Sequence, residues 1–212
     1  MAHGPDTEEL LNRMSRNTKS LEIAHLNITS LPQLSFELTI LDCSSTLISL
    51  LPDLPPGLKA LKCCNTLLTT LPELPEGLLE LWCSNTQLTS LPELPSSLLD
   101  IVCSYNQLTS LPDLPSGLKY LHCTDTQLTT LPELPPALKY IYCPNTPLIL
   151  QQDIDESIAD YNQRWREWRE EEESKKRIQA KHHLLKEEIV MEAWHPRKVE
   201  RWLDLGAELE DL

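Results

Sequence analysis

Cysteine is the residue type of this chain with the most reactive side chain, and six of the seven cysteines recur at a spacing of 20 residues. Thiols can pair as disulfides or, when deprotonated, act as nucleophiles. Disulfide frameworks seldom have such regular spacing, and Met1–Glu9 lacks the apolar segment of a secretory signal. We therefore expect reduced thiols in an intracellular, cytoplasmic protein. The six regularly spaced residues are Cys43, Cys63, Cys83, Cys103, Cys123 and Cys143.

The seventh cysteine, Cys64, stands next to one of these six and is predicted to lie on the outer surface. It is therefore the candidate for a reactive thiol. The sequence places no histidine or other base beside it that would favour the thiolate.

A second column of polar residues follows each of the six cysteines by three positions. A short polar side chain at a turn can hydrogen-bond the backbone of its own or the neighbouring segment. We interpret this column, together with the cysteines, as a structural ladder inside the protein and not as a series of nucleophiles. Its members are Thr46, Thr66, Thr86, Asn106, Thr126 and Thr146.

No other pattern predicts catalysis, because the sequence has no glycine-rich phosphate loop and no Gly-x-Ser-x-Gly motif. His182, His183 and His195 lack metal-ligand spacing with other ligands. We expect no enzyme activity, no cofactor and no metal. The net charge of −14 is opposite to the basic surface that phosphate binding needs, and no apolar run could span a bilayer. Neither nucleic acid nor a membrane is an expected partner.

The elements that would position these residues are six tandem 20-residue repeats, from Leu31 to Leu150. Their shared pattern is L-P-x-L-P-x-x-L-x-x-L-x-C-x-x-T-x-L-x-x. A fixed period of this size predicts a solenoid in which each coil buries its apolar edge against its neighbours. The segment L-x-x-L-x-C predicts a strand whose Leu and Cys point inward and whose intervening residue points outward. Stacked coils would then form a parallel sheet.

The proline-rich half of each repeat should form the opposite side of the coil. Proline fixes φ near the polyproline II value and excludes a regular helix, so we expect an extended convex side and a sheet on the concave side. An acidic row follows this side. We interpret it as a solvated surface, with binding of a basic partner as the alternative. The row comprises Gln33, Asp53, Glu73, Glu93, Asp113 and Glu133.

The repeats resemble the leucine-rich repeat family, because L-x-x-L-x-C-x-x-T-x-L stands where that family has L-x-x-L-x-L-x-x-N-x-L. The 20-residue length and the L-P-x-L-P segment resemble the short repeats of bacterial effector proteins, and the cysteine- and threonine-bearing repeats are similar to those of large DNA viruses. The resemblance covers Leu21–Leu148. It implies an α/β repeat fold, a leucine-rich repeat solenoid with helical N- and C-terminal caps, and a role in recognition.

Some bacterial members of this family add a ubiquitin-ligase domain with a catalytic cysteine. That activity does not carry over, because the last cysteine of this chain, Cys143, lies within the repeats.

Composition divides the chain into three parts. Residues 1–30 are predicted to form a helical cap, with a helix over Glu8–Arg16, and a degenerate first repeat with a strand at Leu21–Ile23. Residues 31–150 are the six repeats. Residues 151–212 form a charged, Trp-rich helical cap or tail.

Apolar residues at helical spacing indicate the helices of this tail. A second apolar stripe, which begins at Ile178, is out of phase with the first, and the charged run Glu170–Arg177 lies between them as an exposed helix or a hinge. We predict two helices or one bent helix, followed by a short helix from Pro196 to before Gly206. The first stripe comprises Ile154, Ile158, Tyr161, Trp165 and Trp168.

Aromatic residues gather at the outward strand positions, mostly in the C-terminal half of the repeats. Tyr and Trp supply large contact areas and are enriched at interface hot spots. We predict that these residues bind a protein partner; packing of the C-terminal cap and the ordinary strand preference of aromatics are the alternatives. The predicted partner-binding residues are Trp82, Val102, Tyr105, Tyr120, His122, Tyr140 and Tyr142.

The leading hypothesis is a non-enzymatic protein–protein interaction scaffold that binds its partner through the aromatic concave face, in a host cell if the chain is a viral or pathogen protein. The alternative is a structural or self-assembling protein of the virion type. Such a protein would associate through the solenoid ends and the helical tail.

Overall fold

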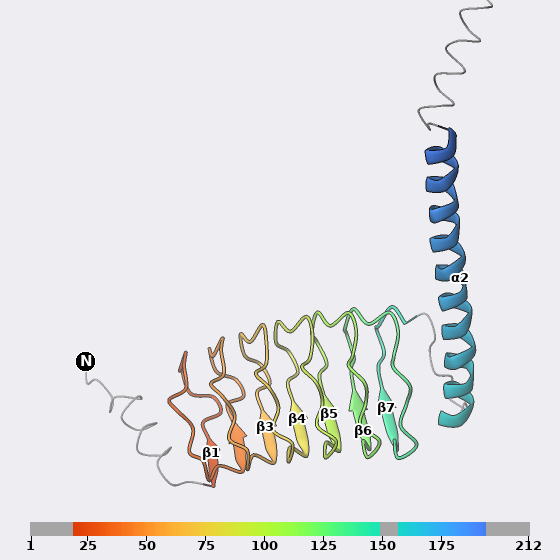
Figure 1. Cartoon of the computed structure of the whole chain (residues 1–212). Helices are drawn as coiled ribbons and strands as arrows, with labels where there is room; N and C mark the ends of the chain where they lie inside the picture. The colour runs from red at the N-terminus through yellow and green to blue at the C-terminus, as the bar shows by residue number, and fades with distance from the viewer. Residues whose placement is uncertain (1–18, 149–156, 194–212) are drawn as a thin grey trace, which may run out of the picture. The chain divides into compact units, whose positions relative to one another are not determined.

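Seven short parallel strands, one per coil, form a single sheet in chain order (Figure 1). The structure is a computed structural model that describes residues 19–148 and 157–193, with side chains up to residue 181. The chain divides into two compact units, Met1–Asn162 and Gln163–Leu212, which are described separately. The strands are β1 (Ser20–Glu22), β2 (Ile40–Asp42), β3 (Ala60–Lys62), β4 (Glu80–Trp82), β5 (Asp100–Val102), β6 (Tyr120–His122) and β7 (Tyr140–Tyr142).

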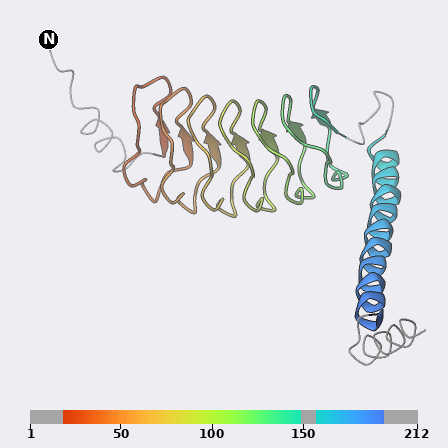
Figure 2. The ribbon, with the colours of Figure 1, turned by 90° about the horizontal axis from the view of Figure 1, so that it is seen from above.

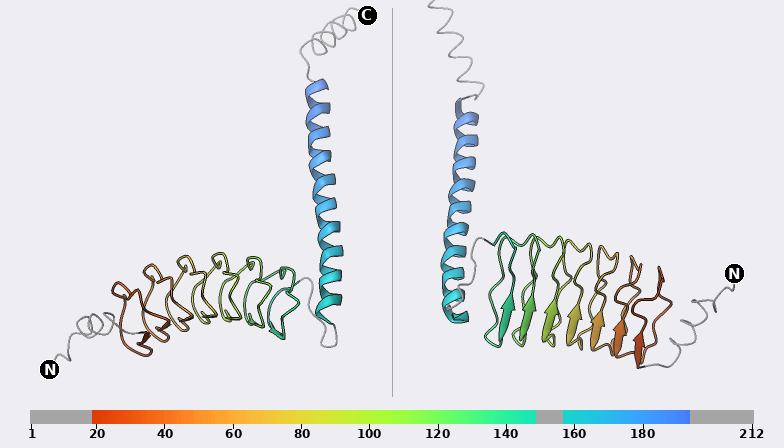
Figure 3. Two further views of the ribbon diagram at one scale, coloured as in Figure 1. Left: turned by 60° about the horizontal axis from the view of Figure 1, so that its bottom comes forward. Right: turned by 180° about the vertical axis from the view of Figure 1, so that it is seen from behind.

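The sheet has one register throughout, because each residue of a strand pairs with the residue 20 positions later. Figures 2 and 3 show the coils lying side by side in sequence order. The predicted degenerate first repeat supplies β1, which begins one residue before the predicted strand. The parallel-sheet solenoid predicted from the 20-residue period is thus confirmed.

The interior of the solenoid is aliphatic. In β1 to β6 the central strand residue has no exposed surface, as in Leu41, Leu81 and Ile101. The regularly spaced cysteines follow directly after the strands, and Cys83 donates its backbone N–H to Val102 of the next coil over 2.8 Å. This bond recurs from coil to coil, so the inward-facing small thiol continues both the core and the hydrogen-bond ladder.

The Thr column closes the turn that follows each cysteine. In four coils the Thr hydroxyl donates to the carbonyl of the cysteine three residues earlier, for example from Thr46 to Cys43 over 2.8 Å. Two positions after the cysteine, or after Ile23 in the first coil, one residue of each coil has a positive φ, between 50° and 63°. These residues are His25, Ser45, Asn65, Asn85, Tyr105, Asp125 and Asn145.

The L-P-x-L-P segments contain no helix or strand in the described coils. Each segment ends in a tight turn, in which the N–H of the leucine before the strand bonds the carbonyl three residues earlier, as from Leu78 to Pro75 over 3.0 Å. The acidic side chains of this segment, such as Glu73 and Glu93, are exposed.

The first turn of α2 (Ile158–Ala193) belongs to the unit that contains the repeats. The Ser157 hydroxyl accepts the Asp160 N–H over 3.2 Å, which satisfies a free donor at the helix start. The Asn162 side chain bonds both backbone groups of Leu134, donating over 2.6 Å and accepting over 2.8 Å. Tyr161 is fully buried. These contacts join the start of the helix to the repeat that contains Leu134.

In the second unit, α2 continues without interruption to Ala193, so the prediction of two helices or one bent helix was wrong. Figure 1 shows one straight ribbon across the charged run. Ion pairs at helical spacing explain the continuity: Lys175 contacts Glu171 and Glu172, each over 3.0 Å. The predicted helices at residues 8–16 and 196–205 lie outside the described residues.

Candidate partner-binding surface

The outward positions of the seven strands form the candidate surface, which we call the strand face. Because successive residues of a strand point to opposite sides, the residues before and after each buried centre lie on one face. The first column of the strand face comprises Ser20, Ile40, Ala60, Glu80, Asp100, Tyr120 and Tyr140. The second column comprises Glu22, Asp42, Lys62, Trp82, Val102, His122 and Tyr142.

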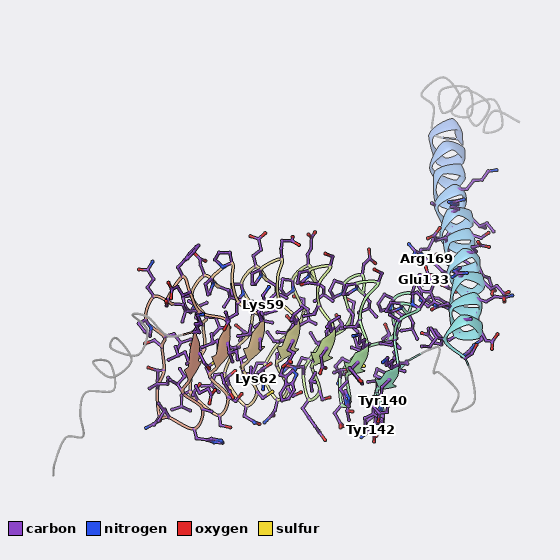
Figure 4. The ribbon with its side chains drawn as sticks, turned by 90° about the horizontal axis from the view of Figure 1, so that it is seen from below. Lys59, Lys62, Glu133, Tyr140, Tyr142 and Arg169 are labelled. Atoms are coloured by element: carbon purple, nitrogen blue, oxygen red, sulfur yellow. The ribbon has the colours of Figure 1, made fainter. Side chains whose placement is uncertain are left out.

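Four of the predicted binding residues form an aromatic cluster on β6 and β7. The register pairs Tyr120 with Tyr140 and His122 with Tyr142. The His122 ring centroid lies 5.2 Å from that of Tyr140 and 6.1 Å from that of Tyr142, and the two tyrosine rings of β7 stack with centroids 6.2 Å apart. The three tyrosines keep between 42% and 49% of their surface exposed. Figure 4 shows Tyr140 and Tyr142 together at the C-terminal end of the sheet.

Trp82 and Val102 extend the second column from this cluster toward the N-terminus. Both are half-buried and occupy consecutive rungs with His122. On the next rung, Lys62 places its Nζ 4.2 Å from the centroid of the Trp82 ring, which is a cation–π contact. The strand face therefore already holds one cation of this chain against an aromatic ring.

Tyr105 lies beyond its strand, at the position of the positive φ. Its φ is 55° and its side chain is 58% exposed. The left-handed region is costly for residues with a Cβ, and Asn and Asp tolerate it best. In the neighbouring coils Asn85 donates to Asn65 over 2.7 Å and Asn145 to Asp125 over 3.3 Å. Tyr105 interrupts this row with an exposed aromatic ring.

Sequence reasoning missed two functional candidates, Glu80 and Asp100. They occupy the first column on adjacent rungs of β4 and β5, and Asp100 pairs in turn with Tyr120 on β6. Burial and the neighbouring Glu80 raise the pKa of the Asp100 carboxyl, and His122 and the Trp82 indole oppose that rise. Although Trp82 lies beside Asp100, neither Trp82 Nε1 nor Asp100 Oδ1 makes a hydrogen bond of ordinary geometry, and both atoms are buried. The signal that could have identified the pair is two carboxylates in adjacent rungs of a face column.

In five of the six ladder cysteines the pKa is raised, which favours the neutral, poorly nucleophilic thiol. Burial raises the pKa of Cys43 and of Cys103 to about 12. It also raises the pKa values of Cys63 and Cys83 well above the usual range. At the C-terminal end, the interaction between the neighbouring thiols of Cys123 and Cys143 raises the pKa of Cys123 and lowers that of Cys143. All seven cysteines are free thiols.

Cys64, the candidate for a reactive thiol, is half-buried. Burial is also the largest influence on its pKa, which is raised. The neutral thiol, which is the poor nucleophile, is therefore favoured at this position.

The polar column is buried, from Thr126 at 1% exposure to Thr86 at 8%. Its one amide, Asn106, makes more bonds than the threonines. It accepts from the Thr86 hydroxyl and from the Leu88 N–H, and it donates to the carbonyls of Cys83 and Cys103. Asn106 therefore joins two adjacent coils.

Within the described residues, no group of three or more His, Cys, Asp or Glu side chains is placed to hold a metal ion. None of the helical residues that the structure describes forms a segment long and apolar enough to cross a membrane. The side chains of His182 and His183, and the whole of His195, lie outside the described part of the chain.

The 20-residue period, the parallel sheet and the buried Leu or Ile at the centre of the strands define a leucine-rich repeat protein. Solved structures of similar proteins support this assignment. The chain is similar to the leucine-rich repeat domain of a Shigella effector, with 35% identity over 69% of this chain and 65% of that chain, and a TM-score of 0.61. It is also similar to YopM, a leucine-rich effector protein from Yersinia pestis, with 33% identity over 66% of this chain and 46% of that chain, and a TM-score of 0.57. This is a leucine-rich repeat protein similar to bacterial effectors. No protein-family model and no curated protein matches the chain.

Proposed function

We propose that the chain is a non-enzymatic scaffold that binds a protein partner inside a cell, and that the strand face is the binding surface. The observation that carries the proposal is the aromatic cluster of β6 and β7, whose three tyrosines are nearly half exposed. Large aromatic groups that remain exposed on a folded surface commonly mark an interaction site, because they bury much apolar area and keep a polar end for hydrogen bonding.

The distribution of aromatic residues also supports a binding site over simple strand preference. In the first column, β2 and β3 carry Ile40 and Ala60, β4 and β5 carry carboxylates, and β6 and β7 carry tyrosines. All seven strands share one register and one backbone geometry, so strand preference alone would not confine the tyrosines to two neighbouring rungs. The effectors to which the chain is similar are leucine-rich repeat proteins too, and this fold serves as a recognition scaffold.

The double variant Tyr120→Ala/Tyr142→Ala tests the proposal. Both side chains are substantially exposed, so the free energy of unfolding should change by less than about 1 kcal/mol. Affinity capture from host lysate with the full chain as bait should lose its specific partner, because hot-spot truncation typically costs about 2 kcal/mol or more of binding energy.

The matched control is Phe36→Ala, which removes an aromatic ring that is 76% exposed and lies outside the strand face. Capture should survive this change. A folded double variant that still captures the partner as well as the wild type would show that the aromatic cluster is not the binding surface.

A further inference from the structure

Two carboxylates occupy the middle of the strand face, directly beside the aromatic cluster. Glu80 and Asp100 are paired across β4 and β5, so only one rung, about 4.8 Å, separates their backbones. Tyr120 follows on the next rung of the same column. Among the residues that the structure describes, no Lys or Arg forms an ion pair with either carboxylate.

The electrostatics of this pair favour an added positive charge. Burial and the like charge of Glu80 both raise the pKa of Asp100, which means that its ionised form is under-stabilised in the free protein. Asp100 Oδ1 itself is buried beside the Trp82 indole, so a partner would contact the remaining carboxylate oxygens of the pair. A cation from the partner would offset the repulsion between the two carboxylates.

Aromatic groups of the strand face can hold the flat face of such a cation. The Trp82 ring, on the same strand as Glu80, shows such a contact within the chain, because it carries the Lys62 ammonium at 4.2 Å and is occupied by it. On the C-terminal side, the rings of His122, Tyr140 and Tyr142 lie within 6.2 Å of one another and the tyrosines are exposed. A guanidinium can bind both the carboxylates and the aromatic rings. It forms two parallel hydrogen bonds to a carboxylate and stacks its flat face on aromatic rings.

We infer that the partner presents an arginine-bearing basic peptide segment to the strand face, with one guanidinium bound by Glu80 and Asp100 and stacked beside the aromatic cluster. This inference rests on the proposed function and adds the chemistry of the partner. Charge complementarity supports it further, because the chain has a net charge of −14 and repels polyanions.

A random peptide library, selected on the full chain, tests the inference while the partner itself is unidentified. Selected peptides should be enriched in arginine. Replacing the critical arginine by citrulline, which keeps the shape and removes the charge, should weaken binding at least about tenfold, because a charge-assisted fork is lost. The variant Glu80→Gln/Asp100→Asn should weaken binding of the unmodified peptide by a similar factor and flatten its dependence on salt.

The matched control is Glu93→Gln/Asp113→Asn, which removes the same charge from the exposed acidic row outside the strand face. This control should bind within about twofold of the wild type, because exposed charges at a distance are screened. Circular dichroism of both variants should match the wild type, since each substitution is nearly isosteric.

The outcomes separate this inference from the proposed function. Peptides that bind Glu80→Gln/Asp100→Asn as tightly as wild type, and fail on Tyr120→Ala/Tyr142→Ala, would overturn the inference and leave the proposed function standing. Peptides that bind the tyrosine variant at full strength would overturn both, as would a library that yields no binder. Arginine-rich peptides that fail on both variants and bind the control would support both.

Discussion

At the centre of each strand the side chain is Leu or Ile in all seven coils, whereas the flanking positions range from Ala60 to Tyr142. The two sets of positions belong to the same three-residue strands and share one backbone. The central residues of β1 to β6 are fully buried, and the flanking ones are mostly half-buried or exposed. Repetition therefore marks the residues that hold the solenoid together, and variation marks those that are free to recognise something else.

One residue in the interior and one residue on the outside depart from the pattern of the repeats. In the interior, Asn106 replaces the Thr of every other complete repeat. Outside, Tyr105 replaces the Asn, Asp or Ser of the other repeats at the positive-φ position. Both exceptions lie in the same coil, one residue apart, and they permit direct tests of which departures serve the fold and which serve the surface.

Asn106→Ala should have the largest effect on stability, a loss of about 3 kcal/mol in the free energy of unfolding. The substitution leaves the Leu88 N–H and the Cys83 carbonyl without the bonds of 3.1 Å and 2.9 Å that Asn106 makes to them, inside a buried site. Urea denaturation followed by circular dichroism measures the change.

The matched variant is Asn106→Thr, which installs the residue of the other repeats. A threonine can still donate to the Cys103 carbonyl, as Thr126 does to Cys123 over 3.0 Å, so about half of the loss should be recovered. Equal stability of Asn106→Ala and the wild type would show that the inter-coil bonds of this side chain contribute nothing.

The inward and outward assignment of the strands could be derived from the sequence, because period-2 alternation within a 20-residue repeat leaves little choice. Leu81 and Trp82 differ in direction for that reason alone. The pairing of Glu80 with Asp100 also follows from the register. Its importance could not be derived from the sequence, because it depends on partial burial and on the missing hydrogen bond of Asp100 Oδ1.

Two features of the fold required coordinates. The left-handed position of Tyr105 is indicated only indirectly, by the Asn and Asp residues that occupy the same position in other coils. The continuity of α2 does not follow from the phase of its apolar residues, because charge pairs sustain it. Lys175 pairs with acidic residues one turn earlier and carries the helix across a stretch with no apolar face.

The buried thiols should make the solenoid sensitive to alkali. The pKa of Cys103 is raised from the ordinary value of 9.0 to about 12 in the folded protein. As the pH rises, the unfolded chain therefore loses this proton at a lower pH than the folded protein does. The contribution of the neutral Cys103 thiol to the free energy of unfolding is present below about pH 9 and is lost as the pH rises toward 12. Between these pH values, one such thiol lowers the free energy of unfolding by about 1.4 kcal/mol for each pH unit, which is a slope of about −1.4 kcal/mol per pH unit.

Cys103→Ala should remove that share of the slope, and unfolding measured by urea at several pH values between 9 and 11 would detect it. The comparison with Cys64→Ala sharpens the result, because Cys64 is only half-buried and should change the slope less. An unchanged slope in Cys103→Ala would mean that this thiol titrates alike in the folded and unfolded chain.

Tyr105→Asn should have the smallest effect on stability and the opposite sign. Asparagine adopts a φ of 55° with less strain than tyrosine and can bond its counterparts on the neighbouring rungs, as Asn85 does with Asn65. We expect a gain of about 0.5–1 kcal/mol, visible as a rise of about 2–4 °C in Tm. The reverse change, Asn85→Tyr, should lower Tm by a similar amount.

The same Tyr105→Asn variant should lose partner affinity if the exposed ring belongs to the binding surface. Strain that a fold retains at one coil and avoids in its neighbours is expected where the side chain serves recognition. A variant that is more stable and binds less well would place Tyr105 with the strand face, and one that is more stable and binds unchanged would remove it from that surface. A less stable variant would show that the ring itself packs in a way that outweighs the strain of its backbone.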